Sequence, residues 1–181
     1  MKMGGMNKSA SVELYTTMVI EGIDNKSLAK DVLSKSDCRI SDDPLESRYE
    51  DTEFPNTENT KDLILKIDSE IYEMDFNLER KSIWSHILEP QQSTIPHNHQ
   101  EDQWDGGLPD ENGLSFVYYV TYPKQSGNIV FDFQMAHKRM NYGIEPMVGM
   151  LIIFPTWIPH YTTRNVSDEI RISISGNYFP Q

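Results

Sequence analysis

The first part of the chain contains one run of residues with a strand pattern and two runs with a helix pattern. Residues 14–23 are rich in Thr, Val and Ile, which predicts a strand. Asp24 offers a helix cap, and apolar residues then recur at helical spacing over 26–35 and again over 60–74. Residues 36–59 are acidic and polar and contain two prolines, which indicates a long surface loop between the two helices.

After residue 76 the pattern changes to short β-rich runs that glycines, prolines and asparagines separate. These runs cover 81–89, 114–122, 128–133, 150–154 and 170–179. Such spacing favours an antiparallel sandwich or barrel. We therefore expect a mainly β protein with N-terminal helices, folded as one domain over 1–181. Within it, 1–11 are expected to be disordered, 12–76 to form a strand and helices, and 77–181 to form the β core.

Composition narrows the classes of partner. Sixteen basic and 28 acidic residues give a formal net charge of −12, which repels nucleic-acid phosphates and anionic membranes. The charge favours a neutral or cationic small molecule or peptide as substrate. The one cysteine, Cys38, has no internal disulfide partner, and no run approaches the roughly 18 apolar residues of a membrane span. A soluble, cytoplasmic protein is expected.

Three of the five histidines lie in two short motifs. His97 and His99 are two residues apart, so an extended strand would project both from one face. His160 follows the motif PTWIP after an apolar run. Neutral imidazole suits divalent iron, zinc and copper, so the three predict a metal centre. Asp102 is an alternative ligand if a bulge corrects its parity, and ordinary polar histidines are the other alternative.

Polar and apolar residues alternate over 170–179. One face would carry Arg171, Ser173, Ser175 and Asn177, and the isoleucines would take the other. The isoleucine face belongs in a core, whereas the polar face lies in solvent or lines a pocket. An arginine fork suits a carboxylate, so beside His160 it predicts a site for an acidic co-substrate. The alternative is a surface arginine.

Other residues are candidates for a substrate pocket. Trp84 and His86 share a face of the run before the histidine motif, where they would line the pocket, although a core position is the alternative for the tryptophan. The segment 100–113 contains Trp104 and is long for a connection, so it predicts a substrate lid or a flexible surface loop. Asn177 is a further pocket candidate.

The order of several motifs resembles the 2-oxoglutarate and Fe(II)-dependent oxygenase superfamily, in its prolyl-hydroxylase-like branch. The likeness covers residues 83–178, in the pieces PHNH, SFVYYV, SGNIVFDF, EPMVGMLIIFPTWIPH and RISIS. It implies a double-stranded β-helix, the jelly roll that cupins also have. It also implies that His97, His99 and His160 bind Fe(II). The residues implied for the distal carboxylate of 2-oxoglutarate are Arg171, Tyr119 and Ser173.

One residue departs from the family pattern. His99 stands where the superfamily usually has a carboxylate, and three neutral ligands leave more positive charge on a ferrous ion. The resemblance implies a dioxygenase that hydroxylates an unidentified substrate and forms succinate and CO2. The alternatives are a cupin-type three-histidine metalloenzyme that does not use 2-oxoglutarate, and a non-catalytic jelly-roll binding module.

Overall fold

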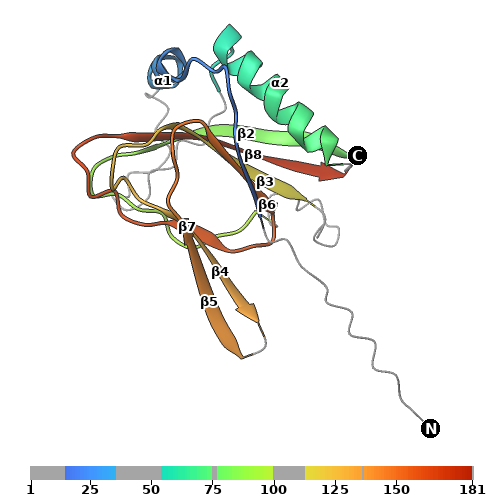
Figure 1. Ribbon diagram of the computed structural model, residues 1–181, viewed down its shortest axis with the longest axis vertical. Coiled ribbons are helices and arrows are strands. Elements are labelled where there is room, and N and C mark those ends of the chain that lie inside the picture. The colour runs from blue at the N-terminus through green and yellow to red at the C-terminus, as the bar shows by residue number, and fades with distance from the viewer. Residues whose placement is uncertain (1–14, 36–53, 75–76, 100–112, 136, 181) are drawn as a thin grey trace.

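The computed structural model describes residues 15–35, 54–74, 77–99, 113–135 and 137–180. They form two antiparallel sheets that face each other, with helices on one side (Figure 1). The major sheet has the strand order β1 (Thr16–Val19), β6 (Met150–Pro155), β3 (Leu114–Thr121), β8 (Arg171–Pro180) and β2 (Leu78–Leu88). The minor sheet has the order β5 (Lys138–Ile144), β4 (Ile129–Met135) and β7 (His160–Thr162).

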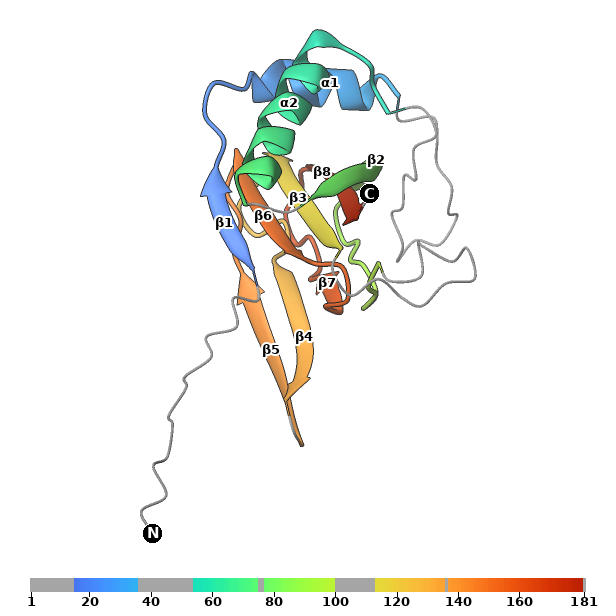
Figure 2. The ribbon, with the colours of Figure 1, turned by 90° about the vertical axis from the view of Figure 1, so that its right-hand side faces the viewer.

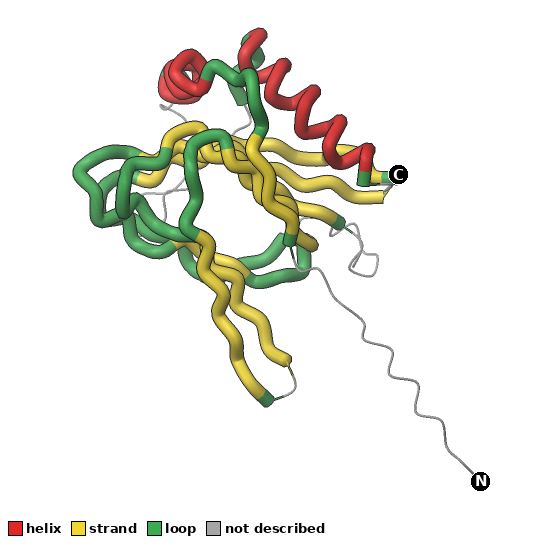
Figure 3. The backbone as a smooth tube through the Cα atoms, in the orientation of Figure 1, coloured by secondary structure: helices red, strands yellow, loops and turns green. Residues whose placement is uncertain are grey.

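The connections produce a jelly roll. After β3 the chain passes to the minor sheet for β4 and β5, returns for β6, crosses again for β7 and ends on β8 (Figure 3). The expected mainly β fold with N-terminal helices is confirmed. β1 extends the major sheet at the edge, beside β6. It ends at Val19 rather than at residue 23, because Gly22 takes a positive φ of 76° and the chain then turns into a helix.

The two helices, α1 (Asn25–Leu33) and α2 (Glu58–Glu73), cover the outer face of the major sheet (Figure 2). Asp24 caps α1 through the backbone N–H groups of Lys26 and Ser27, and Thr57 forms a capping box on α2, which therefore begins before residue 60. Neither of these described helices is long and apolar enough to cross a membrane. Their apolar faces bury Leu28, Val32, Leu63, Ile67 and Ile71.

Both faces of β8 are buried. Ile172 and Ile174 point into the core beneath the helices, as the alternation predicts. The opposite face points between the sheets, and its Arg171, Ser173 and Asn177 are at most 1% exposed. The sequence left open whether this polar face lies in solvent or lines a pocket. The structure places it in the interior. The alternative of a surface arginine is wrong, because the minor sheet covers this face.

Two strands were not expected from the sequence. β5 lies in a polar segment, and its side chains are almost all exposed, so it has no buried alternating face. It forms through backbone pairing with β4, from Ile129 opposite Ile144 to Met135 opposite Lys138. β7 has only three residues and carries His160.

Several expectations concern residues outside the described ranges. They are the disorder over 1–11, most of the polar loop over 36–59, and nearly all of the predicted lid over 100–113. Trp104 and Asp102 lie there too, so their predicted roles stay predictions.

Gly176 marks a close approach between β8, β2 and β3. A Cβ at this position would lie 2.5 Å from the carbonyl oxygen of Ser82 and 2.6 Å from the ring of Phe116. We expect Gly176→Ala to cost about 1–3 kcal/mol, because neither neighbour can move without disturbing the sheet. Thermal unfolding should show a melting temperature lower by roughly 2–4 °C per kcal/mol. Gly143→Ala on β5 is the matched control, since its Cβ would meet only Val130 and Ile129 of β4 at ordinary distances. An equal loss there would contradict this account.

Candidate metal and co-substrate site

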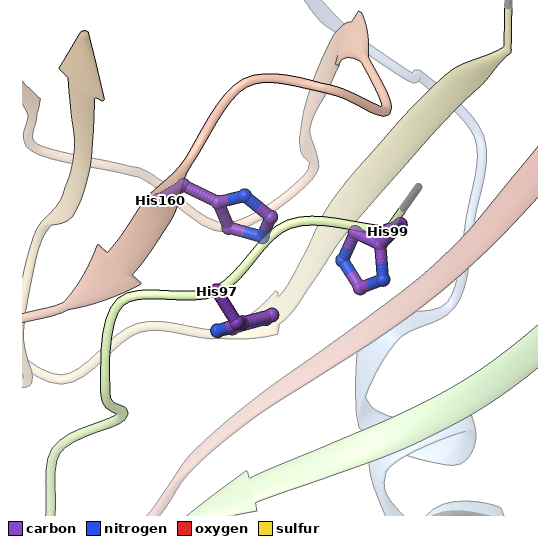
Figure 4. A group of neighbouring side chains, drawn as sticks. All are labelled: His97, His99 and His160. Carbon is purple, nitrogen blue, oxygen red and sulfur yellow. The ribbon is translucent and has the colours of Figure 1, made fainter. Parts of the chain in front are cut away.

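The three histidines of the two motifs converge between the sheets (Figure 4). Ring centroids are 4.5 Å apart for His97 and His160, 5.1 Å for His99 and His160, and 5.2 Å for His97 and His99. One ligand nitrogen from each ring lies within 4.8 Å of the others. The structure thus brings together the three histidines that the sequence predicts as metal ligands, and their binding of a metal stays a prediction.

Backbone pairing sets their positions. His97 N–H donates to the carbonyl of His160 at 3.0 Å, and His160 N–H donates back at 2.8 Å. His99 N–H donates to the carbonyl of Thr156 at 2.9 Å. The segment that holds His97 and His99 thus runs beside β7, although it makes only an isolated bridge rather than a regular strand. Pro96 has no N–H to donate, which prevents a continuous ladder.

Two of the imidazoles have a defined tautomer. Nδ1 of His97 lies 2.8 Å from the carbonyl oxygen of Ile95, and Nδ1 of His160 lies 3.0 Å from that of Ile158. A carbonyl only accepts, so Nδ1–H is the donor in both rings and Nε2 keeps its lone pair. Histidines that bind metals commonly donate their other nitrogen to a carbonyl in this way.

The surroundings of His160 keep it neutral. Burial lowers its pKa well below the ordinary value, and the neighbouring His97 and His99 lower it further. Phe154 packs against it at 4.7 Å between ring centroids and separates it from bulk water. A neutral, desolvated imidazole beside two others fits a divalent first-row metal ion. In the described residues, the cluster contains no carboxylate.

Arg171 is the second feature of the site. Its guanidinium is buried, donating from Nη1 to the carbonyl of Gly127 at 3.2 Å and from Nη2 to Oγ1 of Thr162 at 3.4 Å. Its Nε has no partner, and no ion pair among the described residues involves it. A buried charge without a counter-charge is costly, so this position suits an anionic ligand.

Hydroxyl groups accompany this arginine. The ring of Tyr119 lies 5.5 Å from the guanidinium carbon of Arg171, and burial raises the pKa of this tyrosine to about 12. Its hydroxyl therefore stays protonated at neutral pH. Ser173 stands opposite Tyr119 in the β3–β8 register and is buried on the same inner face. The structure thus brings all three residues expected to bind 2-oxoglutarate into one region.

The three pocket candidates lie on the inner face of the major sheet, at different positions along β2 and β8. The ring of Trp84 is 5.3 Å from that of His99, so this half-buried tryptophan borders the cluster. His86 pairs in register with Ser173, between the cluster and Arg171. Asn177 is fully buried at the other end of β8.

Sequence reasoning missed Thr162. It contacts Arg171 and lies two residues after His160 on β7, with both side chains buried. The alternation of inward residues along a strand could have indicated it, but β7 was not predicted.

The fold and the site together define a jelly-roll protein with a cluster of three histidines between its sheets. The profile of the family described as "Putative 2OG-Fe(II) oxygenase" matches residues 82–177, slightly more than half of the chain. The chain belongs to this family. It is therefore a 2-oxoglutarate-dependent oxygenase, and the family together with the histidine cluster supports Fe(II) and 2-oxoglutarate as its cofactor and co-substrate. No curated protein matches the chain in sequence.

Solved structures share the fold at low sequence identity. A prolyl-4-hydroxylase from Pseudomonas putida is 15% identical, with 93% of each chain covered and a TM-score of 0.67. The α-ketoglutarate-dependent carbocyclase SnoK from nogalamycin biosynthesis is 14% identical, with 93% of this chain and 80% of that one covered, at 0.68. A Trichoplax adhaerens prolyl hydroxylase, in complex with a peptide of hypoxia inducible factor, is 16% identical, covering 92% and 83%, at 0.63. The double-stranded β-helix is confirmed by these likenesses.

Proposed function

We propose that the protein is a hydroxylase in which three histidines, His97, His99 and His160, hold Fe(II) and Arg171 holds the distal carboxylate of 2-oxoglutarate. Its products would be succinate, CO2 and a hydroxylated small molecule or peptide. The observation that carries this proposal is the buried guanidinium of Arg171, which has no counter-charge among the described residues and contacts the strand that carries His160.

The spacing of the two features supports a dicarboxylate between them. Thr162, which contacts Arg171, lies two residues from His160 on β7, and both side chains point between the sheets. Two residues of a strand span about 6.6 Å. That distance is comparable with the separation of the two ends of a five-carbon dicarboxylate. 2-Oxoglutarate could therefore reach the metal with its keto-acid end while its other carboxylate meets the arginine.

Each protein group has a definite task in this proposal. Nε2 of His97 and His160 would face the metal, since their Nδ1–H groups are committed to backbone carbonyls. Arg171 would neutralise the distal carboxylate, and Tyr119 and Ser173 would donate hydroxyl hydrogen bonds to it. The apolar side chains of Val117, Ile152 and Phe154 would exclude water from the co-substrate.

The chemistry comes from the bound cofactor. Fe(II) would activate dioxygen in a reaction that consumes 2-oxoglutarate by oxidative decarboxylation. The protein holds the reacting groups in place and keeps the site dry. Three neutral imidazoles leave the dianionic co-substrate to supply the negative charge that a carboxylate ligand usually gives. Asp102 remains an alternative ligand, and it lies outside the described residues.

A cupin-type metalloenzyme would also use three histidines. It would have no need of a buried cation directed at a second carboxylate, and Arg171 therefore favours the 2-oxoglutarate enzyme. The same argument weighs against a non-catalytic jelly-roll module.

The most direct test of the activity needs no substrate. The protein with Fe(II), ascorbate and 2-oxoglutarate should form succinate slowly, and replacing Fe(II) with Zn(II) should abolish this because zinc has no redox chemistry. Succinate is measured by mass spectrometry. If succinate formation exceeds the enzyme-free control with neither Fe(II) nor Zn(II), the proposal is contradicted.

A further inference from the structure

The inner face of the major sheet changes from charged to uncharged along β8. Arg171 lies at one end, and Asn177 lies six residues further on, about 20 Å away along the strand. Asn177 stands opposite Ser82 on β2 and opposite Ser115 on β3. These three residues and Thr156, which pairs with Gly113 just beyond β6, are uncharged, and we call them the neutral polar row.

Three residues of the row are buried, and Ser82 is half-buried with a buried hydroxyl. The hydrogen-bonding groups of the row are only partly paired. Ser115 and Asn177 are 1% and 0% exposed, and Oγ of Ser115 donates to Oδ1 of Asn177 at 2.8 Å. Thr156 is also fully buried, yet its Oγ1 has no hydrogen-bond partner, and neither has Oγ of Ser82. Buried hydroxyls are normally paired, so two orphans in one row require an explanation. A ligand that supplies donors and acceptors would provide it.

The row borders the histidine cluster. The carbonyl of Thr156 accepts the backbone N–H of His99, so the two residues are direct neighbours. Trp84, whose ring lies 5.3 Å from that of His99, is two residues from Ser82 on the same face of β2. The row therefore meets the cluster from the side of Ser82 and Thr156.

The row also lies on the opposite side of the cluster from Arg171. Trp84 pairs with Ser175, which is between Arg171 and Asn177 on β8. The order along the inner face is thus arginine, cluster and neutral row. Since 2-oxoglutarate would occupy the space between the arginine and the cluster, the molecule to be oxidised must approach from the remaining side.

We infer that the neutral polar row binds the substrate through an uncharged hydrogen-bonding group, an amide or a hydroxyl, next to the carbon that is oxidised. This inference rests on the proposed function. Serine, threonine and asparagine both donate and accept, which matches an amide with one donor and one acceptor. A charged group placed here would lose its hydration without gaining a counter-charge. The apolar face of Trp84 would contact the adjacent carbon skeleton.

The substrate class is therefore an uncharged amide, such as an internal residue of a peptide, rather than a free amino acid, a carboxylate or a phosphate ester. A panel of matched compounds tests this with the full chain, Fe(II) and 2-oxoglutarate. The panel contains the common amino acids as N-acetyl N-methylamides, as N-acetyl acids and as free zwitterions. We expect stimulation of succinate formation only by members of the uncharged set. Stimulation by an acid or a zwitterion as strong as by its capped form would overturn the inference.

Variants test the row independently of the panel. Removing an orphan hydroxyl that exists for a ligand should stabilise the free protein, so Ser82→Ala and Thr156→Val should each raise the melting temperature by about 2–4 °C. Ser115→Ala, which breaks a made hydrogen bond, should lower it. If Thr156→Val and Ser82→Ala also lower the melting temperature, their hydroxyls are structural. The inference then fails, whatever the panel of compounds shows.

A matched control separates binding from stability. Ser126 also has a buried hydroxyl without a partner, but it lies next to Gly127 at the arginine end. Ser126→Ala should stabilise the protein without changing the apparent constant for a stimulating compound, whereas Thr156→Val should raise that constant about fivefold. If the two variants have equal apparent constants for the stimulating compound, the neutral polar row does not bind the substrate. Absence of succinate from the unsubstituted protein would count against the proposed function. Calorimetric binding of a capped amide would still test the row, because Thr156→Val should weaken it and Ser126→Ala should not.

Discussion

His160→Ala is expected to abolish stoichiometric Fe(II) binding. His160 is a buried ligand candidate whose neutral ring has Nδ1 engaged by a backbone carbonyl and lies against the two other imidazoles. Two remaining imidazoles cannot hold a ferrous ion against water with useful affinity. The loss should exceed the roughly 10–100-fold that removal of an outer partner of a metal ligand costs. Anaerobic calorimetry with Fe(II) measures it.

The control for this variant is His137→Ala. His137 is exposed at the turn between β4 and β5, so its removal should leave Fe(II) affinity unchanged. Retention of one Fe(II) per chain by His160→Ala would show that the metal binds elsewhere. A loss in both variants would indicate non-specific binding to surface histidines.

Arg171→Ala should raise the apparent constant for 2-oxoglutarate more than tenfold while leaving Fe(II) affinity nearly intact. A buried, charge-assisted pair loses several kcal/mol when one partner is truncated. The guanidinium contacts Gly127 and Thr162 but none of the three histidines by a hydrogen bond among those described, so the metal site should persist. Succinate formation at varied 2-oxoglutarate measures the constant. Arg164→Ala, at an exposed position, is the control.

Arg171→Met sharpens the same prediction. Replacing a buried charge that has no counter-charge with an apolar side chain of similar length removes a desolvation penalty of several kcal/mol. The free protein should therefore melt at a higher temperature, whereas the further stabilisation that 2-oxoglutarate gives should disappear. If 2-oxoglutarate raises the melting temperature of Arg171→Met and of the unsubstituted protein equally, the arginine has another role.

Sequence patterns predicted which side chains lie together better than they predicted the strands that carry them. The i, i+2 spacing of His97 and His99 correctly predicted a shared direction, because an extended segment keeps that property whether or not it is a regular strand. The alternation of β8 correctly separated its isoleucines from Arg171 and Ser173. These patterns are local, so they survive in the folded chain.

Non-local pairing accounts for what the sequence did not predict. β5 is exposed along almost its whole length, and it is a strand only because β4 offers its backbone groups. β7 is too short for a periodic signal, although its pairing with β4 places His160 opposite Phe131. Strand alternation after His160 could indicate that Thr162 points inward, but it could not indicate the contact with Arg171, since that contact joins two strands of different sheets.

A crystal structure grown without oxygen, with Fe(II) and 2-oxoglutarate, tests the central claim most directly. We predict one iron ion with imidazole nitrogens of His97, His99 and His160 at about 2.0–2.2 Å. The distal carboxylate of 2-oxoglutarate should accept hydrogen bonds from Arg171. Coordination by Asp102 with one of the paired histidines turned away would contradict the three-histidine site, and a co-substrate carboxylate remote from Arg171 would contradict the proposed mode of binding.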